Sequence, residues 1–436
     1  MRRFTSMLVH AGLIGAVVIA LAPSAATQVE VPGIDKPVVV VDGRITSNTT
    51  WRSELYYVLR GAVFVESGAS LRIEPGTTIV GETATQGTLV IARGGRILAD
   101  GRADAPIVFT SDQPVGDRGR GDWGGLIING RAPLNVSGGE AIGEGDTGVY
   151  GGDNPNDSSG VLRYVRVEFA GIEFSPDNEL NGIAFQGVGR GTVVDHVQVK
   201  ANKDDGVEFF GGTVDAKHLV LTNIADDSVD WTDGWTGRLQ FVVAHQRGDD
   251  ADNGIEADNS GDNNNLQPRS NPTIYNATFI GDPDRNEGSE SNNGMLLREG
   301  TAATIRNFIV MGFKEFGVNI DGGVSLQQAR AGALSLANGI LFQNAVLADF
   351  AHFNSESAPL FAGRPTIRIA DPGLIDPYNH ERPNYRPRSD ATLAGGQLAP
   401  AVPPNDGFFQ VTTFIGALSP DPAQDWTRGW TNFEIR

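Results

Sequence analysis

A short pattern recurs along the middle of the chain, and it constrains the fold more than any other feature of the sequence. Each copy has a polar or aromatic residue, then glycine or serine, then an apolar residue; the copies occupy 181–183, 205–207, 227–229, 253–255, 293–295 and 316–318. About ten residues before most copies, one residue opens an apolar segment; this set is Tyr164, His196, His218, Gln240, Asn276, Asn307 and Asn338. The intervals within the set are 32, 22, 22, 36, 31 and 31 residues, which a unit of about 22 residues with loop insertions explains.

The segments around these positions alternate apolar and polar residues with a period of two. Examples are "YVLRGAVFVESGASLRIEPGTTIVG" at 57–81 and "LRYVRVEFAG" at 162–171. Such alternation is typical of strands, and the 3.6-residue spacing of amphipathic helices is missing. Strand units repeated at this interval bury their apolar faces by stacking on their neighbours in a solenoid. The sequence therefore predicts an all-β parallel solenoid.

One segment carries a resemblance to a known fold family. The stretch "LVIARGGRILADGRADAPIVFTS" at 89–111 resembles the usual coil of right-handed parallel β-helix proteins of the pectin-lyase-like superfamily. The resemblance covers residues 36–345 and implies a right-handed parallel β-helix with capping segments. The stretch "GDWGGLIINGRAPLN" at 121–135 also resembles an exported bacterial β-helix family. Because this architecture serves lyases, hydrolases, adhesins and inert fibres, the resemblance alone does not choose among these functions.

The two ends of the chain differ from its middle. Residues 1–26 have the arginines, apolar core and small-residue site of a signal peptide, so we expect export and cleavage near Ala26. The β-helix is expected over 27–345. Nine of the 23 prolines lie between 359 and 404, so 346–436 is expected to be a proline-rich return segment and C-terminal cap. The expected location is secreted, either periplasmic or extracellular.

Composition narrows the classes of partner. A formal net charge of -19 argues against nucleic acid, because phosphate binding requires a basic face. After the signal peptide no apolar run is long enough for a transmembrane segment. The chain has no cysteine, so disulfides cannot stabilise it.

An acidic row is predicted on one face of the solenoid. If Val207, Val229 and Ile255 point inward, alternation places the residue after each of them outward; these are Glu208, Asp230 and Glu256. Stacked strands lie about 4.8 Å apart. Unit charges at that distance repel by roughly 1 to 3.5 kcal/mol for a dielectric constant between 80 and 20. A bound cation, a raised pKa, or solvation with cationic neighbours would relieve the repulsion.

Calcium is the candidate cofactor. The loop "RGDDADNGIEADNSGDNNN" at 247–265 is rich in oxygen ligands, and its candidate metal ligands are Asp249, Asp250, Asp252 and Glu256. The loop lacks the later glycine and the twelfth-position glutamate of an EF-hand, so the site would be irregular.

A second resemblance concerns catalysis. The stretches "KDDGVEF" and "ADDSVDW" resemble the motifs on successive coils of polygalacturonase-type glycoside hydrolases. The resemblance implies an inverting mechanism with Asp205, Asp226 and Asp227 as catalytic residues, since an inverting pair stands ~6.5 to 9.5 Å apart. The chain departs from that family: it has N-K-D-D in place of N-T-D, and it lacks the G-H-G and R-I-K motifs.

The remaining candidates complete three functional hypotheses. Trp231 and Trp235 flank the acidic row, the second in a turn, and Arg298 lies on a neighbouring coil. We expect these three, with Glu208, Asp230 and Glu256, to bind substrate. The preferred hypothesis is binding of an extracellular or envelope polysaccharide by this acidic, tryptophan-flanked face, with calcium support. The alternatives are the inverting glycoside hydrolase and a structural or adhesive surface protein. His196 and His218 are expected in a polar ladder rather than at a metal.

Overall fold

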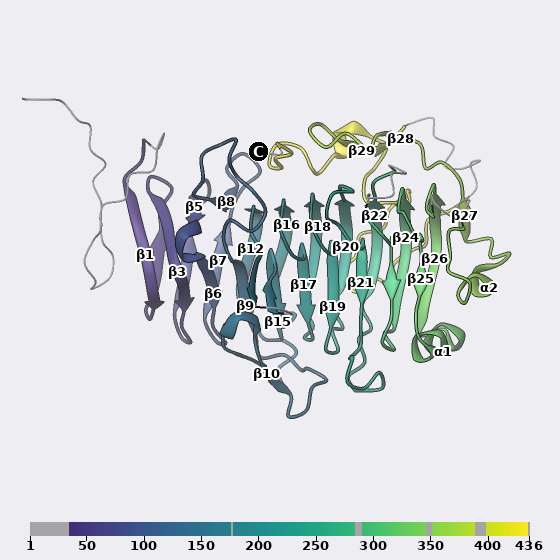
Figure 1. Ribbon diagram of the computed structural model, residues 1–436, viewed down its shortest axis with the longest axis horizontal. Helices are drawn as coiled ribbons and strands as arrows, with labels where there is room; N and C mark the ends of the chain where they lie inside the picture. Colours follow the sequence, from purple (N-terminus) through teal and green to yellow (C-terminus); the bar gives the residue numbers. More distant parts are fainter. Residues whose placement is uncertain (1–34, 176–177, 284–289, 346–350, 389–397, 435–436) are drawn as a thin grey trace, which may run out of the picture.

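The computed structural model describes residues 35–175, 178–283, 290–345, 351–388 and 398–434. The predicted signal peptide, 1–26, lies outside the described residues. Parallel strands stack side by side along the long axis of the molecule (Figure 1). Within these described residues, twenty-three strands form one continuous hydrogen-bonded system, and every pairing within it is parallel. The chain is therefore an all-β parallel β-helix, as the repeat predicts.

The first coils contain β1 (Val38–Ile45), β2 (Thr49–Trp51), β3 (Tyr56–Val65), β4 (Ser70–Ile73), β5 (Thr78–Gly81), β6 (Thr88–Ile91), β7 (Arg96–Asp100), β8 (Ile107–Ser111) and β9 (Gly125–Asn129). One ladder then continues through β12 (Gly160–Glu168), β16 (Val193–Lys200), β18 (Asp215–Thr222), β20 (Arg238–His245), β22 (Thr273–Ile280), β24 (Ala303–Met311), β26 (Leu334–Phe342) and β27 (Ile367–Ile369). We call this the long ladder.

A second ladder carries the repeated triplets. It continues from β9 through β15 (Ile183–Gln186), β17 (Val207–Phe210), β19 (Val229–Thr232), β21 (Ile255–Ala257), β23 (Leu296–Leu297) and β25 (Asn319–Ile320), and we call it the short ladder. Val207, Val229 and Ile255 are fully buried in the core, as alternation predicts. The apolar residue of each triplet thus anchors its coil, and the residue after it faces outward.

The long ladder bends at one residue per coil. The bend residues have φ between +47° and +63°; they are Tyr164, His196, His218, Phe241, Asn276, Asn307 and Asn338. Six members of the predicted ladder lie at these bends. Gln240 pairs in register with Lys217, one residue before the bend at Phe241, but its Nε2 donates to Asn276 Oδ1 at 3.3 Å, as expected of a ladder member. Asparagine and histidine tolerate this left-handed conformation better than most residues. The aromatic members stack, with ring centroids 4.4 Å apart for Tyr164 and His196 and 4.1 Å for His196 and His218.

Two hairpins project from the coils near the short ladder. They pair β10 (Glu140–Ile142) with β11 (Val149–Gly151) and β13 (Ile172–Ser175) with β14 (Asn178–Leu180). Two helices, α1 (Gly323–Ala331) and α2 (Ala358–Phe361), lie at the C-terminal end of the stack (Figure 1). In the described part of the chain, no helix is long and apolar enough to cross a membrane.

The C-terminal segment runs back along the outside of the long ladder, above β24, β22, β20 and β16 (Figure 1). It follows a hairpin of β28 (Leu374–Asp376) and β29 (Asn384–Pro387). Side-chain amides of the ladder hold it: Asn307 exchanges two hydrogen bonds with the backbone of Ala401, at 2.9 and 2.7 Å. Gln240 does the same with Gln410. We call residues 398–434 the return segment.

Candidate functional site

The polar residue of each triplet forms a column beside the short ladder. This inner column is Asn181, Asp205, Asp227, Asn253 and Asn293. Its side chains link one coil to the next: the Asp227 N–H donates to Asp205 Oδ1 at 3.0 Å, and the Asn253 N–H donates to Asp227 Oδ1 at 2.6 Å. Asp205 and Asp227 are only 6% and 4% exposed. Each carboxylate therefore has one oxygen engaged with a backbone amide of the next coil.

Two further rows of acids flank the inner column. The residues that immediately precede its members form an outer column of Asp204, Asp226, Asp252 and Asn292. On the other side, Glu208 pairs in register with Asp230, and Asp230 with Glu256, as predicted. We call the eight carboxylates of these rows the acidic trough; they are Asp204, Asp205, Glu208, Asp226, Asp227, Asp230, Asp252 and Glu256.

The trough contains four overlapping carboxylate triads whose ligand oxygens lie within 4.8 Å of one another. The triads are Asp204–Asp205–Asp226, Asp205–Glu208–Asp230, Asp226–Asp227–Asp252 and Asp227–Asp230–Glu256. Calcium binds oxygen at 2.3–2.6 Å, so two ligands on opposite sides of the ion are separated by about 4.6 to 5.2 Å. The spacing of these carboxylates therefore suits a calcium-sized ion.

Few positive charges reach the trough. Lys203 pairs with Asp250 at 2.7 Å, and Arg298 pairs with both Glu256 and Asp258. Among the described residues, no ion pair reaches Asp204, Asp205, Glu208, Asp226, Asp227 or Asp230. Asp230 Oδ1 is buried without a hydrogen-bond partner in the part of the chain that the structure describes. The carboxylates therefore need another source of positive charge.

Burial and mutual repulsion raise the pKa values of these acids. Burial, reinforced by neighbouring carboxylates, raises the pKa of Asp204 to about 7 and that of Asp226 to about 6. Burial also raises the pKa of Glu256 to about 7, against the lowering effect of Arg298. Burial also raises the pKa values of four further acids well above their ordinary range; these are Asp205, Glu208, Asp227 and Asp230. At neutral pH the trough must take up either protons or cations.

The outer column opens to solvent. A cavity of about 410 Å³ is lined by Asp204, Asp226, Asp250 and Asp252, together with Glu173, Glu179, Lys203, Ala225, Ala251, Glu290 and Asn292. An ion can therefore reach the outer column from solution, whereas the inner column lies beneath it. Of the three proposed catalytic residues, only Asp226 lines this cavity. An inverting hydrolase needs its catalytic carboxyls to face an open groove that holds substrate and water. Asp205 and Asp227 are buried and do not meet this requirement.

Several predicted site residues lie elsewhere or have other contacts. Trp231 and Trp235 are corrected from sugar-binding to core residues, because both side chains are fully buried. The Trp235 ring stacks on Phe209 at 4.0 Å, and its Nε1 donates to the Val214 carbonyl. Trp231 pairs in register with Phe209 and points into the core, and Trp235 follows it inward after the turn that contains Gly234.

The predicted calcium ligands of the 247–265 loop do not converge. Asp250 and Asp252 line the open cavity, and Glu256 belongs to a different triad. Asp249 points away from the trough and pairs with Arg120 at 3.1 Å and Arg247 at 3.5 Å. Arg298, predicted to bind substrate, instead neutralises Glu256 and Asp258 at one end of the trough. The acids that do converge come from successive coils.

Two contributors to the trough escaped sequence reasoning. Asn181 is fully buried, donates from Nδ2 to Glu208 Oε2 at 2.7 Å, and leaves its Oδ1 without a partner within the described chain. Its place in the repeated triplet was a usable signal. Glu144, from the loop between β10 and β11, contacts Asn181, and burial raises its pKa to about 8. No spacing in the sequence links that loop to the later coils.

Comparison with known proteins identifies one family. A family model described as a pectate-lyase like beta helix domain matches residues 43–359, which is more than half of the chain. No curated protein and no solved structure was found to match. The match covers both ladders as far as β26 and includes the whole acidic trough.

Proposed function

We propose, from the premise that this chain belongs to the pectate-lyase-like beta helix family, that it is an exported protein that binds calcium in its acidic trough and holds a polysaccharide through the bound ions. The observation that carries the proposal is the set of four overlapping carboxylate triads in a buried row. A row of acids costs stability unless it is neutralised, and no described ion pair neutralises its inner members.

The donor set favours calcium among the common cations. Carboxylate and amide oxygens are the ligands of hard cations, and Ca²⁺ accepts six to eight oxygens in irregular geometry. The trough supplies carboxylates from three coils, and the free Oδ1 of Asn181 lies beside Glu208. Magnesium requires near-ideal octahedral geometry, which overlapping triads do not supply.

Bound calcium also explains how an acidic face could hold a glycan. Without cations the trough would repel any polysaccharide that carries carboxylates. An ion in the open cavity beside Asp204 and Asp226 would keep coordination positions for sugar hydroxyl or carboxylate oxygens. The buried tryptophans remove the stacking platform, so the bound ions are the recognition element in this proposal.

Calorimetry tests the metal half of the proposal. We expect chelator-treated protein to bind Ca²⁺ and to release protons near neutral pH, because the raised pKa values leave several trough carboxyls protonated. Asp226→Asn should weaken binding at least about tenfold. Asp104→Asn, at a side chain that is 79% exposed, is the matched control and should change nothing. Equal binding by wild type and Asp226→Asn would contradict the site.

Affinity electrophoresis tests the glycan half. Gels containing polysaccharides that carry uronic acids should retard the wild-type protein in calcium but not in chelator. The Asp226→Asn variant should migrate freely in both. Retardation that persists in chelator would show that the glycan binds without the ions.

A further inference from the structure

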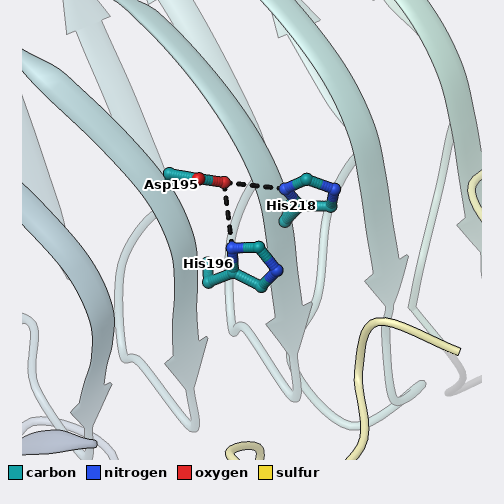
Figure 2. A group of neighbouring side chains, drawn as sticks. All are labelled: Asp195, His196 and His218. Atoms are coloured by element: carbon teal, nitrogen blue, oxygen red, sulfur yellow. Dashed lines mark hydrogen bonds and ion pairs between the residues drawn. The ribbon is translucent and has the colours of Figure 1, made fainter. Parts of the chain in front are cut away.

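A second candidate site lies on the long ladder, where the ladder bends. Asp195 and His196 are neighbours on β16, and His218 lies on the adjacent strand β18. Figure 2 shows both imidazole rings turning a nitrogen toward the same carboxylate. His218 Nδ1 is 2.7 Å from Asp195 Oδ1, and His196 Nδ1 is 3.0 Å from the same oxygen. Three metal-type donor atoms thus converge from two coils.

Hydrogen bonds do not account for all three of these metal-type ligand atoms. The His218 contact has the geometry of a hydrogen bond, with the role of Nδ1 set by the tautomer. His196 Nδ1 is buried and, despite its short distance to Asp195, has no correctly oriented hydrogen-bond partner among the described residues. A buried ring nitrogen that faces a carboxylate without a proper hydrogen bond requires an explanation.

The fold does not require imidazole rings at these positions. The same bend is occupied by Phe241 in the next coil and by asparagine at 276, 307 and 338, all with positive φ. The side chains of phenylalanine and asparagine have no imidazole nitrogen, and the ladder still makes the same bend. In register, the position of Asp195 is taken by Lys217, and that ammonium lies over the Phe408 ring at 4.6 Å. Among the described residues, this is the one group of three metal-type donors within 4.8 Å of one another that contains histidine.

We propose that Asp195, His196 and His218 bind a divalent first-row transition-metal ion such as Zn²⁺. Two imidazole nitrogens and one carboxylate are the donor set that zinc, nickel and copper favour over calcium. Ions held at about 2.0 to 2.2 Å need donor atoms that are slightly farther apart than hydrogen-bonded ones, so the side chains must part by a few tenths of an ångström. The side chains are 30%, 15% and 12% exposed, so the site is reachable from solvent.

The arginine nearest in register has a partner of its own. Arg163, the register partner of Asp195 on β12, pairs with Asp100 at 2.6 Å. His218 lines a cavity of about 490 Å³ beneath the return segment, which supplies an approach for water. Trp426 and Trp430 form edge-to-face contacts with the histidine rings, with centroids 5.0 Å apart for Trp426 and His218 and 5.7 Å for Trp430 and His196. Metal binding here would therefore be sensed by tryptophan fluorescence.

The test uses the mature protein in excess calcium, so that calcium occupies the acidic trough and Zn²⁺ binding there does not contribute to the signal. Zn²⁺ is titrated by calorimetry, and Cu²⁺ is followed by quenching of tryptophan fluorescence and by its electron paramagnetic resonance spectrum. We expect saturable binding with nitrogen hyperfine structure in the spectrum. His196→Asn combined with His218→Asn should weaken binding at least about tenfold. Asparagine is the residue that the ladder itself uses at this bend, so the variant should fold.

Two controls make the result decisive. His352→Asn removes a buried histidine elsewhere and should leave Zn²⁺ affinity unchanged. Asp226→Asn, in the trough, should also leave it unchanged, which separates this site from the proposed calcium site. Absence of saturable Zn²⁺ binding, or equal binding by a double variant whose circular dichroism is native, would overturn the proposal.

Discussion

At the scale of single residues, Asp230 is the clearest point of stress in the trough. It lies between Glu208 and Glu256 in register, and its Oδ1 has no partner in the described chain. Burial and the charge of Glu256 raise its pKa well above the ordinary range. An acid in this position destabilises the cation-free protein whenever it is ionised.

We therefore predict that Asp230→Asn stabilises the protein in chelator by about 1 to 3 kcal/mol, because asparagine avoids the cost of either ionising or protonating a buried acid between two others. In calcium the same variant should lose most of the stabilisation that the wild type gains. Thermal unfolding followed by circular dichroism measures both effects, with Asp104→Asn as the exposed control. A lower melting temperature of the variant in chelator would show that the Asp230 carboxyl does not destabilise the cation-free protein.

Trp235 gives a second residue-scale prediction. Its ring is fully buried and stacks on Phe209, so Trp235→Ala should cost about 3 to 5 kcal/mol of folding stability through lost packing. The surviving folded protein should bind calcium and glycan as the wild type does. Loss of glycan binding without loss of stability would restore the sugar-stacking interpretation.

At the scale of elements, the bend of the long ladder serves two purposes. It turns the chain within each coil, and its amide side chains hold the return segment. Asn307 is fully buried and makes both amide hydrogen bonds to Ala401, whereas Asn338 makes one bond of 3.0 Å to Ala399 in an exposed setting. The return segment therefore depends on the ladder for its backbone hydrogen bonds.

Asn307→Gly keeps the positive φ but removes both bonds. We predict a loss of about 1 to 3 kcal/mol and faster proteolytic cleavage within 398–434. Asn338→Gly is the matched control, with the same backbone conformation and one weaker bond, and should have a smaller effect. Limited proteolysis with mass spectrometry locates the cuts. Equal cleavage of both variants would show that the side-chain amides do not hold the segment.

The repeat allowed the strands to be predicted, but it did not show which of their outward-facing side chains other segments bury. Period-two alternation correctly placed Val207, Val229 and Ile255 inside, because strand geometry fixes the side of each residue. The burial of Glu208 and of Trp235 was not predictable in this way, because Glu208 bonds to Asn181 of an earlier coil and the ring of Trp235 packs inward on Phe209. The bend at Phe241 was missed because the polar residue that opens this segment, Gln240, lies one position before it.

At the scale of the whole molecule, the trough should make stability depend on pH. The pKa values of Asp204 and Asp226 rise to about 7 and 6 in the folded chain, above their values in an unfolded chain. Folded protein therefore holds more protons between about pH 4 and 7, so its stability is greatest at the acidic end and falls as pH rises. The direction is opposite to that of a salt-bridged carboxylate.

We predict that cation-free protein melts at a higher temperature at pH 5 than at pH 8. Saturating calcium should remove or reverse that difference, because the ion replaces the protons. Thermal melts in chelator and in calcium across this range measure the effect. A cation-free melting temperature that rises steadily from pH 5 to pH 8 would contradict the raised pKa values.

The most direct test is a crystal structure of the mature protein grown in calcium, with anomalous difference density measured at long wavelength. We predict peaks in the acidic trough, about 2.3 to 2.6 Å from carboxylate oxygens of the triads that contain Asp226 or Asp230. Fully ordered carboxylates that coordinate only water at saturating calcium would contradict it.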